Sequence, residues 1–449
     1  MPRNASTGMN SLLFVLAALL SAGLPAAWAG QIELVTRVPP GLSSDSASGG
    51  SSAPKLSADG RYLVFLSDAP NLVPGQIDRN GGNDVFLYDR VTGKTVLVSH
   101  AAGSEVTAGD LPVTLPGTIE GLPPQISPDG RYVAFTSEAG NLVAGQREQD
   151  SLNVTPDLFL YDRQTRTTTL VTHKGGSAVT SSNSSLFDFR MTSDGSIAFS
   201  SPASDLVEHG TDTNFSLDVF FWDRRSGTTT LISHAASSSR RAAQGISDGA
   251  WPSADGRYIA FGSDASDLLP GLPHNIGNVF LYDRVSGKTV LVSHASSSPS
   301  KPANRGGGGP VLNAAGTYLV FASTATDLVP GLQDDTPLYF DIYLYERATG
   351  KIVLVSHTSS SLVTTGDGDS RAYNITPDGS WVVFLSRAGN LVAGQTETEG
   401  HSIDVFLFER ATGKILLASR AAASPVTAAN QDCSEFDLSA DGRWVVFTT

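Results

Sequence analysis

The sequence predicts an all-β fold, a β-propeller of about seven blades. Two observations lead to this prediction. A motif of about twelve residues with an Asp-Gly turn recurs along almost the whole chain, and self-similarity at a regular period is typical of repeat architectures. Between successive copies lie short alternating segments rich in β-branched and aromatic residues. Such segments favour strands, and no helical periodicity follows the first 29 residues.

The recurring motif is clearest in LSADGRYLVFLS, which starts at Leu56, and in ISPDGRYVAFTS, which starts at Ile126. Its turn position occurs seven times, at intervals of 60 to 70 residues: Asp59, Asp129, Asp194, Asp255, Ala315, Asp378 and Asp441. The repeated units start near residues 54, 124, 188, 250, 310, 373 and 435. Together they are expected to form one domain that spans residues 30–449.

Each unit is expected to contain four antiparallel strands, A to D, as a propeller blade does. In the first unit, strand A is APKLS (residues 53–57) and strand B is RYLVFLS (61–67). Strand C is DVFLYDR (84–90), and a tight turn leads to strand D, TVLVSH (95–100). One phenylalanine in each strand B is expected to pack between blades: Phe65, Phe135, Phe199, Phe261, Phe321, Phe384 and Phe447.

The two ends each supply less than a blade. IELVTR (residues 32–37) aligns with strand D, and residues 435–449 supply only strands A and B. We expect the N-terminal strand to lie beside the last blade and close the ring, because closure removes an exposed sheet edge. Strands B and D run in the same direction, so strand D cannot replace strand C as an antiparallel neighbour. A segment resembling DVFLYDR is therefore expected to follow Thr449. The alternative is a three-stranded seventh blade with one parallel pair.

The first 29 residues have the pattern of a secretory signal peptide. Arg3 precedes an apolar run, SLLFVLAALL (residues 11–20), and AWA (27–29) places small residues before a cleavage site at Gly30. Export predicts a periplasmic or secreted protein without a membrane span after cleavage. An uncleaved anchor is the alternative.

Charge and cysteine content narrow the classes of partner. The chain has 30 basic and 44 acidic residues, and loss of Arg3 with the signal leaves 29 − 44 = −15. So acidic a protein is not expected to bind nucleic acid or anionic membrane surfaces. Cys433 is the only cysteine, which excludes an internal disulfide. We expect it to be a small buried apolar side chain.

The segments SPDGRYVAF (residues 127–135) and DLFLYDR (157–163) resemble the WD40-like repeats of TolB-type β-propellers. The resemblance covers nearly all of residues 54–449 and implies the fold. It implies little about activity, because propellers include binding proteins, lyases and hydrolases. TolB carries an α/β domain before its propeller, whereas about two dozen residues separate Gly30 from the first unit here. The resemblance is therefore to the propeller alone.

The long, variable B–C and D–A connections are the expected site, because long loops on a rigid scaffold usually carry function. One candidate set of ligand-binding residues ends strand D: His100, His173, His234, His294 and His357. Strand D is the outermost strand of a blade, so these histidines are expected to lie too far apart to share one metal. A structural role as caps or hydrogen-bond partners is the alternative.

The B–C loop supplies a second candidate set. It begins with an Asx residue, two apolar residues and a glycine, as in NLVPG from Asn71, which predicts a structural turn with an apolar plug. It then becomes acidic in DRNGGND (78–84) and DTNFSLD (212–218), with oxygen-bearing side chains spaced as in a calcium loop. The candidate calcium ligands are Asp78, Asn80, Asp84, Asp212, Asn214 and Asp218. Because the pattern of an EF-hand loop is incomplete, a solvated loop is the alternative.

Other catalytic signals are weak. The acid–Arg pairs that end strand C, such as Asp89-Arg90, are expected to bridge blades, because adjacent strand residues point to opposite faces. No Gly-x-Ser-x-Gly elbow follows the propeller. We expect a non-catalytic, monomeric propeller that binds an envelope or extracellular protein or a glycan on its long-loop face, with calcium as its one candidate cofactor. A propeller enzyme such as a polysaccharide lyase or glycosidase is the alternative.

Overall fold

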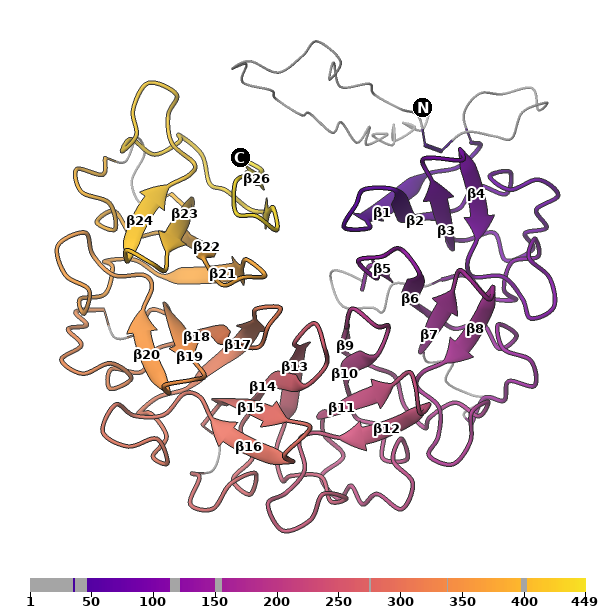
Figure 1. Cartoon of the computed structure of the whole chain (residues 1–449), viewed down its shortest axis with the longest axis horizontal. Coiled ribbons are helices and arrows are strands. Elements are labelled where there is room, and N and C mark those ends of the chain that lie inside the picture. Colours follow the sequence, from indigo (N-terminus) through magenta and orange to yellow (C-terminus); the bar gives the residue numbers. More distant parts are fainter. Residues whose placement is uncertain are drawn as a thin grey trace, which may run out of the picture.

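The computed structural model describes residues 35–36, 47–113, 122–149, 156–273, 276–336, 338–396 and 402–449. Within these residues the regular elements are all strands. Six four-stranded antiparallel sheets, each formed by consecutive strands, are followed by a two-stranded sheet. Figure 1 shows the sheets side by side around a common axis, in an open ring with the first and last sheets at its ends. The predicted all-β propeller fold is confirmed.

We call the six four-stranded sheets blades 1 to 6. The inner strands, which correspond to strand A, are β1 (Ser51–Leu56), β5 (Gln125–Ile126), β9 (Asp188–Met191), β13 (Ser247–Pro252), β17 (Gly307–Leu312) and β21 (Ser370–Ile375). The B strands are β2 (Tyr62–Ser67), β6 (Tyr132–Ser137), β10 (Ile197–Ser201), β14 (Tyr258–Ser263), β18 (Tyr318–Ser323) and β22 (Trp381–Ser386).

Strands C and D complete each blade toward the outer rim (Figure 1). The C strands are β3 (Asp84–Asp89), β7 (Asp157–Asp162), β11 (Asp218–Asp223), β15 (Asn278–Asp283), β19 (Asp341–Glu346) and β23 (Asp404–Glu409). The D strands are β4 (Lys94–Leu97), β8 (Thr167–Leu170), β12 (Thr228–Leu231), β16 (Lys288–Leu291), β20 (Lys351–Leu354) and β24 (Lys414–Leu417). The seventh sheet consists of β25 (Phe436–Leu438) and β26 (Val445–Phe447).

Strand D is shorter than the sequence predicts. The prediction extends it to His100, but β4 ends at Leu97. Beyond this point Val98 packs in the core between blades 1 and 2, and the Ser99 hydroxyl bonds to strand C instead, donating to Asp84 Oδ1 at 2.7 Å. Val98 still donates its amide to the Val85 carbonyl of strand C at 2.8 Å, and the regular pairing ends there.

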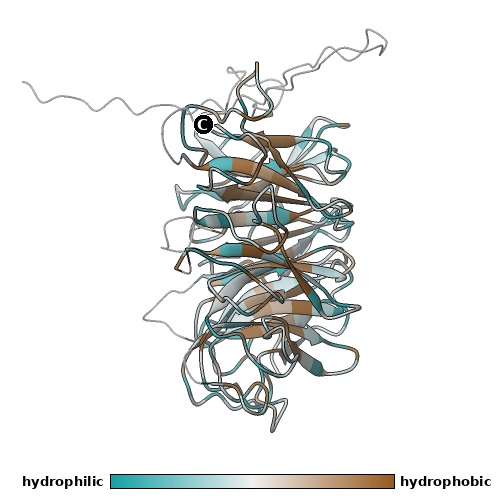
Figure 2. Ribbon diagram, turned by 90° about the vertical axis from the view of Figure 1, so that its left-hand side faces the viewer, coloured by the Kyte–Doolittle hydropathy of each residue, from teal (hydrophilic) through white to brown (hydrophobic). Residues whose placement is uncertain are grey.

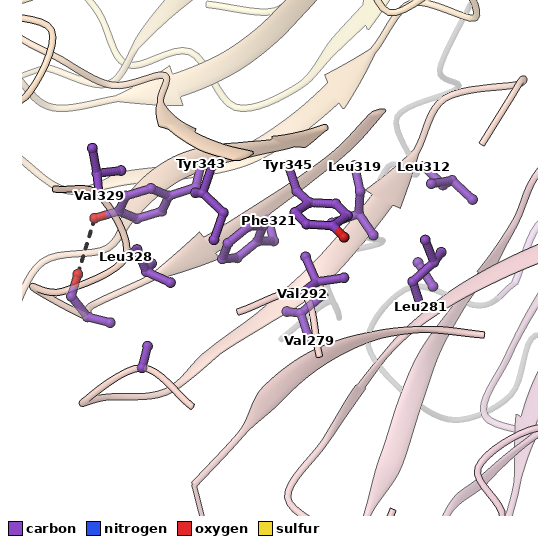
Figure 3. Close-up of a cluster of buried hydrophobic side chains, with 14 of the residues drawn as sticks. Val279, Leu281, Val292, Leu312, Leu319, Phe321, Leu328, Val329, Tyr343 and Tyr345 are labelled. Carbon is purple, nitrogen blue, oxygen red and sulfur yellow. Dashed lines mark hydrogen bonds between the residues drawn. The ribbon is translucent and has the colours of Figure 1, made fainter. Parts of the chain in front are cut away.

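The core lies between successive blades, because strands B and C bury both of their faces. Seen from the side, the blades form one flattened layer with apolar segments along the strands (Figure 2). Figure 3 shows the buried cluster between blades 4 and 5. It includes Phe321 and Tyr343 of blade 5, whose stacked rings have centroids 5.7 Å apart. Val279 and Val292 of blade 4 belong to the same buried cluster. Burial of each such side chain contributes about 1.5–3 kcal/mol to stability.

Six of the seven phenylalanines predicted to pack between blades are buried: Phe65, Phe135, Phe199, Phe261, Phe321 and Phe384. The prediction for Phe447 is wrong, since its side chain is 37% exposed. Among the described residues β26 pairs with β25 alone, so no strand C covers it. Cys433, in contrast, is fully buried as expected.

Of the predicted closing strand, residues 32–37, only Val35 and Thr36 fall within the described residues. Val35 packs against the core of blade 1, as the sequence-equivalent Val98 packs between blades 1 and 2. The Thr36 carbonyl accepts a hydrogen bond from the Ala47 amide at 3.0 Å. These two residues thus hold positions equivalent to the end of a strand D that precedes blade 1. Their contact with β25 and β26 stays a prediction.

Candidate functional site

The inner strands differ from blade to blade, whereas the outer three strands repeat. Every strand C has the pattern acid or Asn, apolar, aromatic, apolar or aromatic, aromatic, acid. The inner strands share no such pattern: β9 is DFRM, β13 is SDGAWP and β17 is GGGPVL. Because the repeated strands already form the common fold, residues particular to one inner strand are the first candidates for function. Figure 1 places these strands nearest the axis.

Strand β9 contributes an acid and a base on the same face. Asp188 and Arg190 alternate with Phe189, which is fully buried in the core. The Asp188 carboxylate accepts hydrogen bonds from the Ser200 hydroxyl at 2.9 Å and from the Gly249 amide of blade 4 at 3.0 Å. The pair therefore faces the junction between the inner strands of blades 3 and 4.

Strand β13 completes the group with Asp248 and Trp251. The Arg190 guanidinium lies 4.9 Å from the centre of the Trp251 ring, a cation–π contact. The Trp251 indole N–H donates to the Leu312 carbonyl of blade 5 at 3.0 Å. We call Asp188, Arg190, Asp248 and Trp251 the blade 3–4 cluster.

Electrostatics distinguish this cluster from the rest of the inner surface. Burial raises the pKa of Asp188. Burial and the neighbouring carboxylates of Asp188 and Asp264 raise the pKa of Asp248, while burial lowers the pKa of Arg190. Because their pKa values are raised, Asp188 and Asp248 can donate as well as accept hydrogen bonds with a polar ligand, beside an arginine and an indole.

The cluster lies at the end of the inner strands where the long loops leave. Asp188 pairs with Ser200 and Asp248 pairs with Gly262, each one residue before its strand B ends. The B–C loops follow directly, so the cluster faces the side of the molecule on which the sequence predicts the site.

The five predicted histidines lie at the junctions of successive blades. Each Nδ1 is within 2.8–3.1 Å of the carbonyl oxygen of the following residue. In three of them Nε2 also approaches a glycine carbonyl in the C–D turn of the next blade, as His357 approaches Gly413 at 2.9 Å. Four of the rings meet an aromatic ring of the next strand C edge-on, as His100 meets Tyr161. They lie on five different blades, and ligand binding by them stays a prediction.

The two acidic B–C loops each bring their predicted residues together. In blade 1 the Asp78 carboxylate accepts from the Asn80 amide at 3.0 Å, and both side chains lie near the buried Asp84. In blade 3 the Asp212 carboxylate accepts from the Asn214 backbone amide at 3.0 Å and contributes to the raised pKa of the buried Asp218, whereas the Asn214 side chain bonds to Ala243 and Ser216. Within the described part of the chain, no three His, Cys, Asp or Glu side chains are grouped so that they could hold a metal.

The remaining repeated polar residues are structural. The apolar plug of the B–C loop is buried, as in Leu72 and Leu328. The Asx side chain before it accepts an amide N–H of the preceding blade's D–A connection, as Asp327 does from Asn304 at 2.9 Å. The arginine after strand C stacks on an aromatic ring of the preceding blade, as Arg347 does on Tyr258 at 4.0 Å. The prediction that the acid–Arg pairs bridge blades is confirmed for the arginines, whereas acids such as Asp89 and Asp283 pair with an arginine of their own blade.

An apolar groove of about 750 Å³ lies between blade 6 and the seventh sheet. It is lined by β24 residues such as Leu416 and by Val445 and Phe447 of β26. In a complete blade this region is filled by strand C. The groove is therefore the uncovered flank of blade 6.

The sequence analysis does not predict the blade 3–4 cluster, because its predictions use the residues that the repeated units share. A usable signal is the combination of residues in DFRM and SDGAWP, since two acids, an arginine and a tryptophan on adjacent inner strands occur only at this junction among the described strands.

No family model and no curated protein matches the sequence. Solved structures that are similar include TolB from Acinetobacter baumannii, at 17% identity and a TM-score of 0.32, covering 68% of this chain and 54% of that one. The chain thus spans about half the length of that TolB. The others include the oligogalacturonate lyase of Vibrio parahaemolyticus (11%, TM-score 0.45, 88% and 84% covered) and the β-propeller domain of the Trilobed protease from Pyrococcus furiosus (11%, 0.44, 87% and 88%).

The fold is a β-propeller. The similarity to these solved structures concerns the fold alone. The fold itself is assigned from the blades of this chain. In the part of the chain that the structure describes, no helix is long and apolar enough to cross a membrane.

Proposed function

We propose that this chain is a non-catalytic, secreted or periplasmic β-propeller that binds a protein or a glycan at the blade 3–4 cluster, on its long-loop face. The observation that carries the proposal is the cluster itself. Two coupled carboxylates, an arginine and a tryptophan gather at the mouth of the inner strands, where the repeated fold requires none of them. Arginine and tryptophan are enriched at sites that bind other proteins.

Secretion is supported by the pattern of residues 1–29, which predicts cleavage before Gly30. Expression of the whole chain in a bacterial host, followed by fractionation and N-terminal sequencing, tests this part. A mature protein that begins at Gly30 outside the cytoplasm is the expected result. A product that retains Met1 and sediments with membranes would contradict it.

The ligand is tested with residues 30–449 immobilised and exposed to envelope extract, culture medium and a panel of purified polysaccharides. Asp248→Asn and Arg190→Gln remove the charges of the cluster. Lys288→Gln, an exposed residue at the outer rim of the same blade, is the matched control. We expect the affinity for a retained ligand to fall about tenfold or more in the cluster variants, which corresponds to about 1.4 kcal/mol, and to stay unchanged in the control. Equal affinity in all three variants would contradict the proposal.

An enzyme is the second candidate, and the observation that favours it is the raised pKa of both Asp188 and Asp248. General acid–base catalysis uses such carboxylates, and a polysaccharide lyase or glycosidase is the class proposed. The sequence GISDG at residues 245–249 matches a nucleophile-elbow pattern, but Ser247 is fully buried and its hydroxyl pairs with Ser263 at 2.9 Å. Release of reducing ends or unsaturated products from the polysaccharide panel, lost in Asp248→Asn, would favour this candidate over simple binding.

A further inference from the structure

The long-loop face of blades 3 and 4 carries three large apolar side chains that are exposed to solvent. Phe187, Phe215 and Ile246 are 51%, 79% and 49% exposed. Phe187 and Ile246 lie in the D–A connections that lead into β9 and β13, and Phe215 lies in the B–C loop between β10 and β11. We call these three residues the apolar patch. It borders the blade 3–4 cluster, since Phe187 directly precedes Asp188 and Ile246 lies two residues before Asp248.

The segments that carry the apolar patch lie side by side. The Asn214 side chain donates a hydrogen bond to the Gly245 carbonyl at 3.0 Å, so the residues that follow these two, Phe215 and Ile246, are on neighbouring stretches of chain. Phe187 lies at the same end of the adjacent inner strand, because β9 packs beside β13. The three side chains therefore belong to one region of the surface.

Phe215 occupies a position at which blade 1 has a glycine. Its amide donates to Asp212 Oδ1 at 3.2 Å, as the Gly81 amide donates to Asp78 Oδ1 at 3.1 Å. Both residues have a left-handed backbone, with φ of 53° and 66°. Glycine adopts this conformation freely, whereas a bulky side chain in it is strained. The loop therefore does not need a phenylalanine here, and local strain of this kind is typical of functional sites.

The position of Ile246 is likewise not apolar elsewhere in the repeat. The residue directly before the inner strand is Gly50 in blade 1, Gly306 in blade 5 and Asp369 in blade 6. Single exposed apolar residues are common on protein surfaces. A group of them bordered by polar residues is instead typical of a surface that binds another protein.

Carboxylates surround the apolar patch. Asp264 Oδ1 accepts a hydrogen bond from the Ile246 amide at 2.7 Å, and Asp212 Oδ1 accepts from the Phe215 amide. The blade 3–4 cluster adds the two carboxylates of β9 and β13. A cation brought by a ligand would favour the charged forms of these groups.

Arginines do not balance these acids. Arg190 lies against the Trp251 ring, and Arg241 is paired with Asp267 at 2.7 Å. Arg240 is exposed in the same D–A connection. Acids thus outnumber bases around the patch, as they do in the whole chain, whose net charge is −14. A basic ligand complements this charge.

We propose that the apolar patch and the blade 3–4 cluster together bind a segment of a partner protein that presents apolar side chains beside a lysine or an arginine. The inference rests on the binding function proposed above and selects protein over glycan as the ligand. The apolar side chains of the partner would cover Phe215 and Ile246, and its basic side chain would meet Asp264 and Asp248. Burial of apolar surface supplies affinity, and the opposite charges fix the orientation of the segment.

A phage-displayed library of random peptides, selected on immobilised residues 30–449, tests the chemistry of the partner. We expect the enriched peptides to combine aromatic or aliphatic residues with lysine or arginine. The affinity of a synthetic enriched peptide is then measured by fluorescence anisotropy. Phe215→Gly removes the ring and supplies the residue that suits the backbone, so it is expected to keep or raise the melting temperature. It is expected to reduce the affinity about tenfold or more, and Ile246→Ser is expected to do the same.

Val285→Ser is the matched control. Val285 is 75% exposed, but it lies in the C–D turn of blade 4, at the opposite end of strand C, and its loss is expected to leave the affinity unchanged. A loss of affinity in Asp248→Asn but not in Phe215→Gly would overturn this inference and leave the proposed function standing. Enrichment of acidic peptides, or of none while a polysaccharide is retained, would do the same. Equal affinity in all these variants, or no retained ligand of either kind, would overturn both.

Discussion

Blade 5 and the seventh sheet share the repeat motif and differ in burial. The motif is LNAAGTYLVFAS at residues 312–323 and LSADGRWVVFTT at residues 438–449. In blade 5, Val320 and Phe321 are fully buried, whereas the equivalent Val446 and Phe447 are 63% and 37% exposed. The difference comes from neighbours, since β18 has β19 beside it and blade 6 after it, and β26 pairs with β25 alone among the described strands. Burial in this fold is therefore a property of adjacent strands and blades more than of the motif.

The largest difference between blade 5 and the seventh sheet is expected in hydrogen exchange. Amides of β18 can exchange only through opening of a blade packed on both sides, whereas those of β26 lie at a sheet edge and can exchange by local opening. We expect protection in residues 435–449 to be the lowest of any strand pair and that in β18 to approach the global limit. Mass-spectrometric exchange of residues 30–449 checks this. Equal protection of the two strands would show that the seventh sheet is as well supported as blade 5.

Removing the equivalent phenylalanine ring should reduce stability more in blade 5 than in the seventh sheet. Phe321→Ala removes a buried ring that stacks on Tyr343 and is expected to destabilise the protein by about 3–5 kcal/mol. Phe447→Ala is expected to cost less than about 1 kcal/mol, because the ring is partly in water already. Urea denaturation followed by tryptophan fluorescence measures both. Similar losses would contradict the assignment of Phe447 to an uncovered strand.

A strand C supplied beside β26 should reduce the difference in burial between the seventh sheet and blade 5. Extending the chain after Thr449 with a copy of residues 387–410, the B–C loop and strand C of blade 6, is expected to cover β26 and raise the melting temperature by about 2 °C or more. The control carries Asp in place of the copied residues of Val405 and Leu407, so that it has the length without the apolar face. An equal rise in both extended chains, or none in either, would show that the open edge does not limit stability.

The smallest effect is expected at the arginine after the Asp-Gly turn. In blade 4, Arg257 forms an ion pair with Asp283 at 3.0 Å, and its hydrogen bonds lower the pKa of Asp283 to about 2. Arg443 occupies the same motif position in the seventh sheet. Because the pair is partly exposed, Arg257→Ala is expected to lower the melting temperature only slightly, and Arg443→Ala less still.

The pH dependence identifies the cause of that small effect. Asp283 stays charged in the folded protein down to about pH 2, while in the unfolded chain it is protonated near its ordinary pKa of 3.8. Its contribution is thus complete above about pH 4 and is lost as the pH falls toward 2. The difference in melting temperature between wild type and Arg257→Ala should shrink over this range. A difference that persists unchanged at pH 2.5 would assign the effect to packing of the arginine instead.

The sequence predicts well what each unit has in common. The C strand expected at residues 84–90 forms at Asp84–Asp89, because its alternating apolar and aromatic residues are buried on both sides in every copy. Strand D is shorter than predicted, since it ends at Leu97 and the Val98 side chain packs between blades 1 and 2. The exposure of Phe447 could not be predicted from a motif that is buried elsewhere.

The candidate site was harder to predict for a related reason. Asp188 and Trp251 are 63 residues apart in sequence and are brought to one junction by the packing of β9 beside β13. Repeats reveal the side chains that every unit needs, and a site formed by one pair of units differs from them. The two acidic loops, in contrast, are local in sequence, and for this reason a candidate set can be named from the sequence; metal binding by these residues stays a prediction.

The side-chain contacts between successive blades follow one order around the ring. A later blade supplies the arginine that stacks on an earlier ring, as Arg410 does on Tyr318, and an earlier blade supplies the histidine that approaches a later turn, as His357 approaches Gly413. Several joints thus use the same pair of contacts, while the joint of blades 3 and 4 differs, with Arg284 on the Phe221 ring. Loss or duplication of a unit such as blade 5, whose joints on both sides are of the common kind, would leave the same contacts between the units that meet. A lineage that carries this sequence could therefore vary its blade number by unequal recombination without having to evolve a new interface.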